Sequence, residues 1–277
     1  TDNSLVATGL YRGNLCVLKT DPSGNLLSPI DSVFSTPNFA TLNSNNISAS
    51  FKSNGNLLQN GEVSFYPFQA PIGSGKSPIF ANGLTLGGID AFNQLHLAAQ
   101  SYNNGMDYWS GPLNYYDFNT TDNWNKVWLV SMQQIETHIL DFLDNGVVDN
   151  PIPAIFDYPG FMNTYAKGNN NTSLIVSEPM APFKDLNQNG IYEPNYGEYP
   201  DIKGDQMLWF VFNDGHQRHS QSLGVPLDVQ IKGCAYDYNC SNNSSLFNTV
   251  FVEYDIQNKS LDNYHDFYFG QWVDYDL

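Results

Sequence analysis

The sequence contains KDLNQNGIYEP at residues 184–194 and the nearly continuous apolar run QMLWFVF at residues 206–212. The first stretch is rich in Asp, Asn and Gly, which favour turns and, in Asp and Asn, carry side-chain oxygens. The second is apolar at almost every position, which predicts a strand that is buried on both faces. We therefore expect the turn to fix the start of a central strand, with the rest of the chain organised around this pair.

The turn places side-chain oxygens at alternate positions, in Asp185, Asn187 and Asn189, followed by Gly190. Calcium is a hard ion that takes about six to eight oxygen ligands, and this spacing is that of the first half of an EF-hand loop. Gly190 allows the sharp turn that brings the carbonyl of Ile191 to the same point. The alternative is a plain turn without a metal, because Asp, Asn and Gly also favour such turns.

The EF-hand pattern breaks at its twelfth position, which is Tyr196 and not a glutamate. The missing ligands would have to come from Glu193 or from later carboxylates, among which Asp205 is the first choice, with Asp201 or Glu198 behind it. The candidate metal ligands are Asp185, Asn187, Asn189, Ile191, Glu193, Glu198, Asp201 and Asp205. Because β-type sequence flanks the loop on both sides, we expect a calcium clip between two strands, with a structural role.

The composition is acidic but poor in charge. The formal net charge of the 277 residues is −17, and charged residues make up 14%, against roughly 25% in an average soluble protein. A strongly negative chain would repel a phosphate backbone, which argues against a nucleic-acid partner, and it is compatible with calcium as a cofactor. No apolar run of about 18 residues is present, so the sequence predicts no membrane span.

The alternation of short apolar segments with Gly, Pro and Asn predicts a mainly β fold of the antiparallel β-sandwich type. One amphipathic helix is expected at about residues 131–145, begun by a capping box of Ser131 and Gln134 and ended at Gly146. Its apolar face would consist of Ile135, Ile139, Phe142 and Leu143. His138 is expected on the polar side of this helix, and His96 on the solvent side of a strand.

We expect three regions: a β-rich lobe at residues 1–125, a helix and connector at 126–173, and a sandwich lobe at 174–277 that contains the calcium-type loop. The Asn-rich segment 168–172 is the best candidate boundary. Cys234 and Cys240 lie six residues apart, a spacing that could close a small disulfide loop in an oxidising compartment, with Cys16 left over.

Several stretches, in their order and spacing, resemble large secreted proteins of Bacteroidota that the type IX secretion system exports. The matching stretches are 71–77, 86–91, 97–102, 107–112, 185–194, 204–206, 209–214 and 270–274. The resemblance implies an exported or cell-surface protein, often very long and seldom of assigned activity, with a calcium-type loop at Asp185, Asn187 and Asn189. The C-terminal sorting domain of such cargo is missing, so we expect an N-terminal piece of a longer polypeptide.

The preferred function is a non-enzymatic, calcium-stabilised structural or adhesive module at the bacterial surface, serving attachment, gliding or a filament. Its partners would be copies of itself, other surface proteins, glycans and the secretion machinery. A carbohydrate-binding module or glycan-active enzyme is the alternative, with rings that could stack on a sugar in Tyr108, Trp109 and Trp272. A second alternative is a metallohydrolase, because Asp214, His216 and His219 could share a metal. No catalytic residue is assigned.

Overall fold

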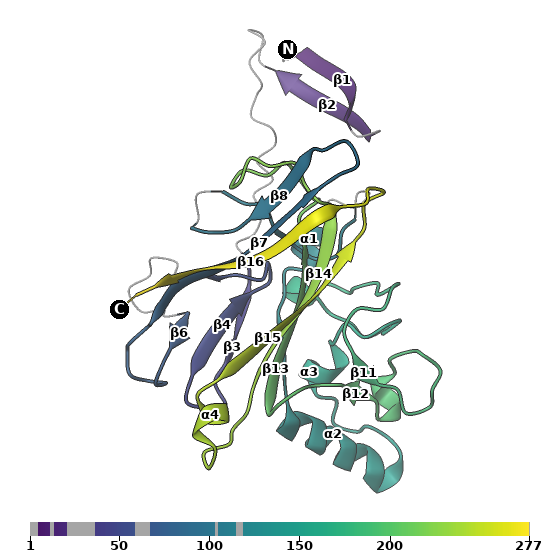
Figure 1. Cartoon of the computed structure of the whole chain (residues 1–277). Helices are drawn as coiled ribbons and strands as arrows, with labels where there is room; N and C mark the ends of the chain where they lie inside the picture. Colours follow the sequence, from purple (N-terminus) through teal and green to yellow (C-terminus); the bar gives the residue numbers. More distant parts are fainter. Residues whose placement is uncertain are drawn as a thin grey trace. The chain divides into compact units, whose positions relative to one another are not determined.

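The structure, a computed structural model, describes residues 5–11, 14–20, 37–58, 67–102, 105–114 and 119–276. The chain forms two compact units, Thr1–Thr36 and Pro37–Leu277 (Figure 1). The first contains an antiparallel hairpin of β1 (Leu5–Tyr11) and β2 (Asn14–Thr20). The candidate site residues all belong to the second unit.

The second unit is mainly β, which confirms the predicted fold class. Its strands are β3 (Phe39–Leu42), β4 (Ser48–Lys52), β5 (Leu57–Leu58), β6 (Phe68–Gln69), β7 (Ile79–Ile89), β8 (Leu95–Ala99), β9 (Trp109–Ser110), β10 (Trp128–Ser131), β11 (Phe183–Lys184), β12 (Tyr199–Pro200), β13 (Gln206–Asn213), β14 (Val229–Asp237), β15 (Val250–Asn258) and β16 (His265–Tyr275). Its helices are α1 (Thr120–Asn123), α2 (Met132–Asn145), α3 (Pro153–Phe156) and α4 (Ser244–Phe247), with 3-10 turns η1 (Asn169–Asn171) and η2 (Pro194–Tyr196).

The central sheet has the strand order β10-β13-β14-β15, and β9 pairs with the end of β13 (Figure 1). All neighbouring strands in it run antiparallel. Strand β13 is buried along nearly its whole length, as the apolar run at 206–212 predicts. Because successive side chains of a strand point to opposite faces, β13 contributes to a core on each side of the sheet.

The first core lies between the central sheet and two further sheets, β3-β4-β6 and β16-β7-β5, with β8 also paired to β7. Phe210 and Phe212 of β13 pack into it, against residues such as Phe51 of β4 and Leu86 of β7. Burial of one such aromatic or aliphatic side chain stabilises a fold by about 1.5–3 kcal/mol. This arrangement is the predicted antiparallel sandwich.

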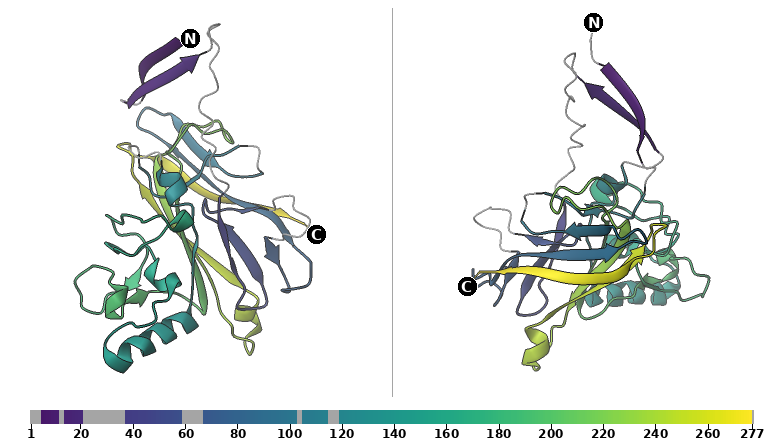
Figure 2. Two further views of the ribbon diagram at one scale, coloured as in Figure 1. Left: turned by 180° about the vertical axis from the view of Figure 1, so that it is seen from behind. Right: turned by 45° about the horizontal axis from the view of Figure 1, so that its top comes forward.

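The second core lies on the opposite face of the central sheet and is covered by helices and long turns, drawn in teal and green in Figure 2. Trp209 of β13 lies 5.6 Å from Trp128, and Trp124 lies 5.9 Å from Trp128, measured between ring centroids. Ile135 of α2 and Tyr192 of the loop after β11 complete this layer. The calcium-type loop is therefore built onto the second core.

Helix α2 begins and ends where the sequence predicts. The Ser131 hydroxyl accepts a hydrogen bond from the backbone N–H of Gln134 at 3.3 Å, and the backbone N–H of Ser131 donates to Gln134 Oε1 at 2.9 Å. Gly146 ends the helix in the left-handed region, at φ 82°. Both halves of the expected capping box and the expected stop are present.

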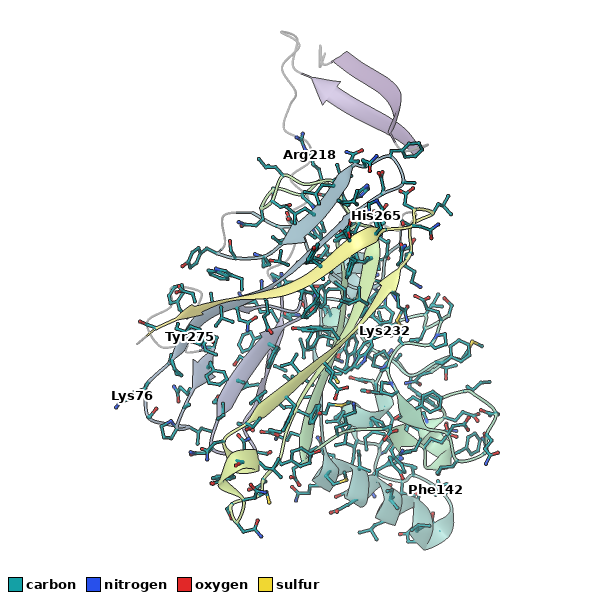
Figure 3. All side chains as sticks on the ribbon, viewed as in Figure 1. Lys76, Phe142, Arg218, Lys232, His265 and Tyr275 are labelled. Carbon is teal, nitrogen blue, oxygen red and sulfur yellow. The ribbon has the colours of Figure 1, made fainter. Side chains whose placement is uncertain are left out.

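The apolar face predicted for α2 needs a correction. Its buried residues are Ile135 and His138, whereas Leu143 is 70% exposed. The side of the helix that faces the protein carries residues 135, 138, 139 and 142, which are spaced by three or four residues. Phe142 on this side packs close to Gly197 and is labelled in Figure 3. Because His138 falls inside this spacing, it is buried and does not lie on a polar side.

The expected division into three regions is not the one observed. β7, from the expected first region, pairs with β16, from the expected third. β10, from the expected connector, pairs with β13. The segment 168–172 lies inside the second unit, where Lys167 and Ser173 form a β-bridge around it. Strand pairing between distant segments thus joins parts of all three expected regions into the unit Pro37–Leu277, while Thr1–Thr36 forms a unit of its own. Within the described residues, no helix is long and apolar enough to cross a membrane.

Candidate functional site

The loop at residues 185–198 connects β11 to β12, so both of its ends are held together where Lys184 pairs with Tyr199. Tyr192 anchors its middle in the second core. The Tyr192 side chain is buried, and its hydroxyl donates a hydrogen bond to the carbonyl of Ile155 at 2.9 Å. The backbone N–H of Tyr192 donates to the carbonyl of Phe161 at 2.8 Å. The loop therefore lies between two strands, as the sequence predicts.

The first half of the loop folds around its own side-chain oxygens. Asp185 Oδ2 accepts a hydrogen bond from the N–H of Gly190 at 2.7 Å, and Asp185 Oδ1 accepts one from Asn189 at 3.2 Å. Asn187 Oδ1 accepts from the N–H of Asn189 at 3.0 Å, and Asn189 Oδ1 accepts from that of Ile191 at 2.7 Å. Gly190 has φ 80°, the left-handed conformation that its position requires.

Glu193 closes this ring of side chains. Its Oε2 accepts hydrogen bonds from the side-chain amides of Asn187, at 3.0 Å, and Asn189, at 2.7 Å. A half-turn of each side-chain amide would bring its oxygen to that point, at the loss of the hydrogen bonds that Oδ1 accepts from the N–H groups of Asn189 and Ile191. Hydrogen bonds thus link Asp185, Asn187, Asn189 and Glu193 around one loop, and in that rotamer their side chains would offer only oxygen ligands.

Glu198 supports the loop from the protein side. It is fully buried, and its Oε1 and Oε2 accept hydrogen bonds from the N–H groups of Leu186, at 3.0 Å, and Glu193, at 2.8 Å. Burial raises the pKa of the Glu198 carboxyl, and these amide N–H groups act against the rise. His138 Nε2 lies 3.0 Å from the backbone carbonyl oxygen of Glu198. Glu198 therefore connects both halves of the loop to helix α2.

The expectation that Asp205 completes the loop needs a correction. Asp205 Oδ2 accepts a hydrogen bond from the N–H of Asn239 at 2.8 Å, and its backbone N–H donates to the carbonyl of Asp237. It is therefore bound to the end of β14. Asp201 forms an ion pair with Lys184, with 2.8 Å between the two side chains. The carboxylate that the side chains of Asn187 and Asn189 contact is that of Glu193.

The donor set of the loop fits a hard cation. It consists of the carboxylates of Asp185 and Glu193, the side-chain amides of Asn187 and Asn189, and the carbonyl of Ile191, and such oxygens suit calcium better than softer metals. In the described part of the chain, no group of three or more His, Cys, Asp and Glu side chains could hold a metal. Any metal at the loop would therefore depend on its amide and carbonyl oxygens.

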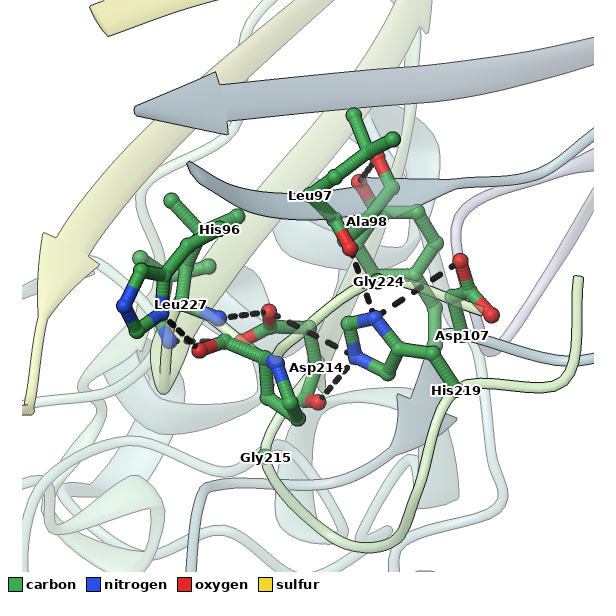
Figure 4. A network of polar contacts seen from close by, with 12 residues as sticks. His96, Leu97, Ala98, Asp107, Asp214, Gly215, His219, Gly224 and Leu227 are labelled. Atoms are coloured by element: carbon green, nitrogen blue, oxygen red, sulfur yellow. Dashed lines mark hydrogen bonds and ion pairs between the residues drawn. The ribbon is translucent and has the colours of Figure 1, made fainter. Parts of the chain in front are cut away.

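A second polar cluster surrounds His219, which the sequence analysis grouped with Asp214 and His216 (Figure 4). His219 is buried, and its Nδ1 lies 2.7 Å from the carbonyl oxygen of Leu97. Its Nε2 lies 2.7 Å from the carbonyl oxygen of Asp214. The carboxylates of Asp107 and Asp214 lie 3.7 Å and 3.6 Å from these two ring nitrogens.

Both carboxylates of this cluster accept backbone hydrogen bonds. Asp214 Oδ1 and Oδ2 accept from the N–H groups of Val229, at 2.7 Å, and Leu227, at 2.6 Å. Burial raises the pKa of Asp214 to about 6, and these two N–H groups and the charge of His219 act against the rise. Asp107 accepts from the N–H groups of Ala99, at 3.0 Å, and Gln221, at 2.9 Å.

This geometry argues against the expected metal site at Asp214, His216 and His219. A histidine binds a metal through an unprotonated ring nitrogen. Both ring nitrogens of His219 already lie 2.7 Å from carbonyl oxygens of the protein, so each is directed at a protein atom and not at a vacant ligand position. The rings of His216 and His219 both lie 6.0 Å from that of Trp109, and burial lowers the pKa of His216.

The expected sugar-stacking platform also needs a correction. Tyr108 is 1% exposed and Trp109 is 3% exposed, so both rings belong to the interior. Tyr108 packs edge-on against Phe212 at 5.4 Å, and its hydroxyl donates to the carbonyl of Ala98 at 3.2 Å. Trp272 is partly exposed and packs edge-on against Tyr102. A single partly exposed indole ring does not form the expected platform.

The expected disulfide between Cys234 and Cys240 is not formed, and both thiols are free. Cys234 lies within β14, paired with Trp209 on one side and Glu253 on the other, and contacts the second core. The strand continues to Asp237, about 10 Å further along, whereas bridged cysteines need Cα atoms roughly 4.4–6.8 Å apart. The thiol of Cys240 instead contacts Asn242 Oδ1 at 2.9 Å.

Two buried polar residues differ from expectation: Asp107, to which the sequence assigns no role, and His96, which is buried and not on the solvent side of its strand. His96 Nδ1 lies 2.5 Å from the carbonyl oxygen of Pro226, and Nε2 lies 3.4 Å from Asp90 Oδ2. The signal available for Asp107 is a charged residue within the aromatic stretch 107–112. In comparisons with protein-family models, curated proteins and solved structures, none matches the chain.

Proposed function

We propose that this chain is a non-enzymatic, calcium-stabilised structural module of an exported bacterial surface protein. The calcium part rests on one observation, the hydrogen-bond network that links Asp185, Asn187, Asn189 and Glu193 in the loop between β11 and β12. An ion there would be held by oxygens alone, as calcium prefers. The residues that would hold it are these four and the carbonyl of Ile191.

Calcium at this loop would stabilise the fold. An ion that binds only the folded state stabilises it by RT ln(1 + [L]/Kd), about 2.7 kcal/mol at a free concentration of 100 Kd. The site is suited to an ion from solvent, because Asn187 and Asn189 are exposed, while Glu198 and Tyr192 attach the loop to the protein. The role of calcium is thus to rigidify the cover of the second core.

The surface setting is supported by the resemblance to type IX secretion cargo and by the shape of the sheets. Among the described strands, β15 pairs only with β14, and β16 pairs only with β7. Each therefore leaves one edge of backbone N–H and C=O groups for contacts with another chain. Copies of the chain or other surface proteins are the proposed partners, with glycans and the secretion machinery as further ones.

Thermal unfolding in EDTA, calcium and magnesium tests the calcium part. We expect the midpoint in excess calcium to lie several degrees above that in EDTA, with magnesium giving a smaller rise because it demands a stricter octahedral geometry. Equilibrium dialysis should find about one bound calcium per chain. A midpoint that is the same in EDTA and in calcium would refute the calcium-stabilised module.

A further inference from the structure

His219 joins segments that are far apart in the sequence. Its Nδ1 faces the carbonyl of Leu97 in β8, and its Nε2 faces the carbonyl of Asp214, just after β13. Asp107, which lies beside Nδ1, precedes β9 and also accepts hydrogen bonds from the N–H groups of Gln221 and Ala99. One buried ring thus connects the sheet that contains β8 with the central sheet (Figure 4).

The proton count of this ring follows from its neighbours. A carbonyl oxygen can only accept a hydrogen bond, so a ring nitrogen at 2.7 Å from it must carry a hydrogen. Both nitrogens of His219 are in this position, at Leu97 and at Asp214. A neutral imidazole has one N–H and would leave a lone pair facing a carbonyl lone pair. Only the doubly protonated imidazolium satisfies both contacts.

The charges around the ring agree with this count. The ordinary penalty for a buried, unpaired cation is several kcal/mol. Here the carboxylates of Asp107 and Asp214 lie on either side of the ring, and each carboxylate accepts backbone N–H groups that favour its ionised form. Asp228 adds negative charge beside Asp214, and the phenols of Tyr108 and Tyr264 also interact with Asp214, while the partly buried His216 lies beside Trp109.

We propose that His219 is a buried imidazolium that acts as a built-in cation, holding Asp107, Asp214 and the carbonyl of Leu97 around one point. The imidazolium supplies the positive charge that a metal ion supplies in other clusters of carboxylate and carbonyl oxygens. Its charge cross-links the two sheets of the sandwich at the end of β13. The inference is independent of calcium binding at the Asp185 loop.

The other histidines provide matched controls in the same molecule. His138 is also fully buried, but only its Nε2 faces a carbonyl, that of Glu198, and its Nδ1 has no hydrogen-bond partner among the described residues. Burial lowers the pKa of His138. His265 is exposed beside Asp266. A free histidine of ordinary pKa is only about a tenth protonated at pH 7.5.

Nitrogen NMR of the wild-type protein labelled with ¹⁵N-histidine tests the proposal, and no variant has to fold. At pH 7.5 both ring nitrogens of His219 should give protonated, N–H-type signals with ring protons that exchange slowly. His138 should show one protonated and one unprotonated nitrogen. The His219 ring is assigned through its contacts with Leu97 and with Trp109. An unprotonated ring nitrogen in His219 at this pH would overturn the proposal.

The double-mutant cycle of His219→Gln and Asp107→Asn gives a second measurement. If the ring is a cation paired with Asp107, the loss of stability in the double variant should be smaller than the sum of the two single losses. When His265→Gln replaces His219→Gln in this cycle, the two single losses should add up to the loss in the double variant, because the imidazole of His265 is exposed. Additive losses for His219 and Asp107 would contradict the ion pairing. If His219→Gln does not fold, the nitrogen spectra of the wild type decide alone.

Discussion

The Asp185 loop and the His219 cluster each gather carboxylates around one point, but they balance the charge differently. The loop exposes Asn187 and Asn189 to solvent and contains no basic side chain at the point of convergence, where two amides contact Glu193. The His219 cluster is closed to solvent and has an imidazole between its two carboxylates. An exposed group of oxygen ligands can bind a cation from solution. A buried group needs a positively charged side chain of the protein beside it.

The largest effect that tests this comparison is expected from Asp214→Ala. The substitution removes the acceptor for the N–H groups of Leu227 and Val229 and one of the two charges beside His219. Removing one partner of a buried ion pair typically costs about 3–5 kcal/mol. Urea denaturation should show that loss in the free energy of unfolding.

The control for Asp214 is Asp255→Ala on the same sheet, where the carboxylate is 61% exposed and 3.9 Å from Lys232. Exposed ion pairs contribute about 0–1 kcal/mol, so this variant should remain close to wild type. Similar losses in the two variants would show that the buried charges around His219 contribute no more to stability than an exposed ion pair does.

The second effect concerns the loop and its ion. Glu193→Gln should abolish most of the gain that calcium gives to the wild type, because it removes the carboxylate on which Asn187 and Asn189 converge. A gain of about 2.7 kcal/mol corresponds to roughly 5–10 °C in a chain of this size. Asp201→Asn is the matched control, since that carboxylate contacts Lys184 instead. Differential scanning calorimetry with and without calcium measures both; loss of the gain in Asp201→Asn would move the site away from Glu193.

The third effect compares two glycines of the loop: Gly197 at its base, next to β12, and Gly190 at its exposed tip. Gly197 has φ 84°, and an added Cβ would lie 2.5 Å from Phe142 of α2. Gly190 has φ 80° but open space around it. The left-handed conformation costs an alanine about 1–2 kcal/mol, and crowding of Phe142 adds about 1–3 kcal/mol. In urea denaturation, Gly197→Ala should therefore be clearly less stable than Gly190→Ala, and equal losses would show that the base is no more tightly packed than the tip.

The smallest effect is a pH dependence at Asp90, beside His96. The N–H of Gln94 lowers the pKa of the Asp90 carboxyl, as do the N–H of Phe92 and the contact with His96, while burial opposes them. A lowered carboxyl pKa stabilises the fold above the ordinary value of 3.8, and this contribution is lost as the pH falls through the lowered pKa. The thermal midpoint of Asp90→Asn should thus lie below wild type at pH 6, and the gap should narrow towards pH 3. A gap that widens in acid would contradict the sign.

How far the sequence could predict this molecule depends on the range of the interactions involved. The capping box of α2 and the turn at Gly190 are local, because partners within about five residues determine them, and both were predicted correctly. Strand β13 was also predictable, since a run of apolar residues has few alternatives to burial. Local sequence chemistry accounts for these elements.

The His219 cluster could not be predicted in this way. Leu97, Asp107 and Asp214 come from separate segments and meet only when β8 and β13 are in place. The spacing of Asp214, His216 and His219 suggests a metal site. It does not reveal that each ring nitrogen of His219 contacts a carbonyl oxygen in the folded chain. The expectation that Asp205 closes the loop is wrong for a similar reason, since pairing of β13 with β14 draws Asp205 to Asn239.

The three neighbouring indole rings of the second core have an optical consequence. The ring of Trp128 lies between the other two, with 5.9 Å to Trp124 and 5.6 Å to Trp209, measured between ring centroids. Aromatic rings this close and fixed in an asymmetric setting couple electronically and give a near-ultraviolet circular dichroism signal that disappears when packing is lost. Because the Asp185 loop is anchored in this core through Tyr192, its loosening can be followed spectroscopically without any added label.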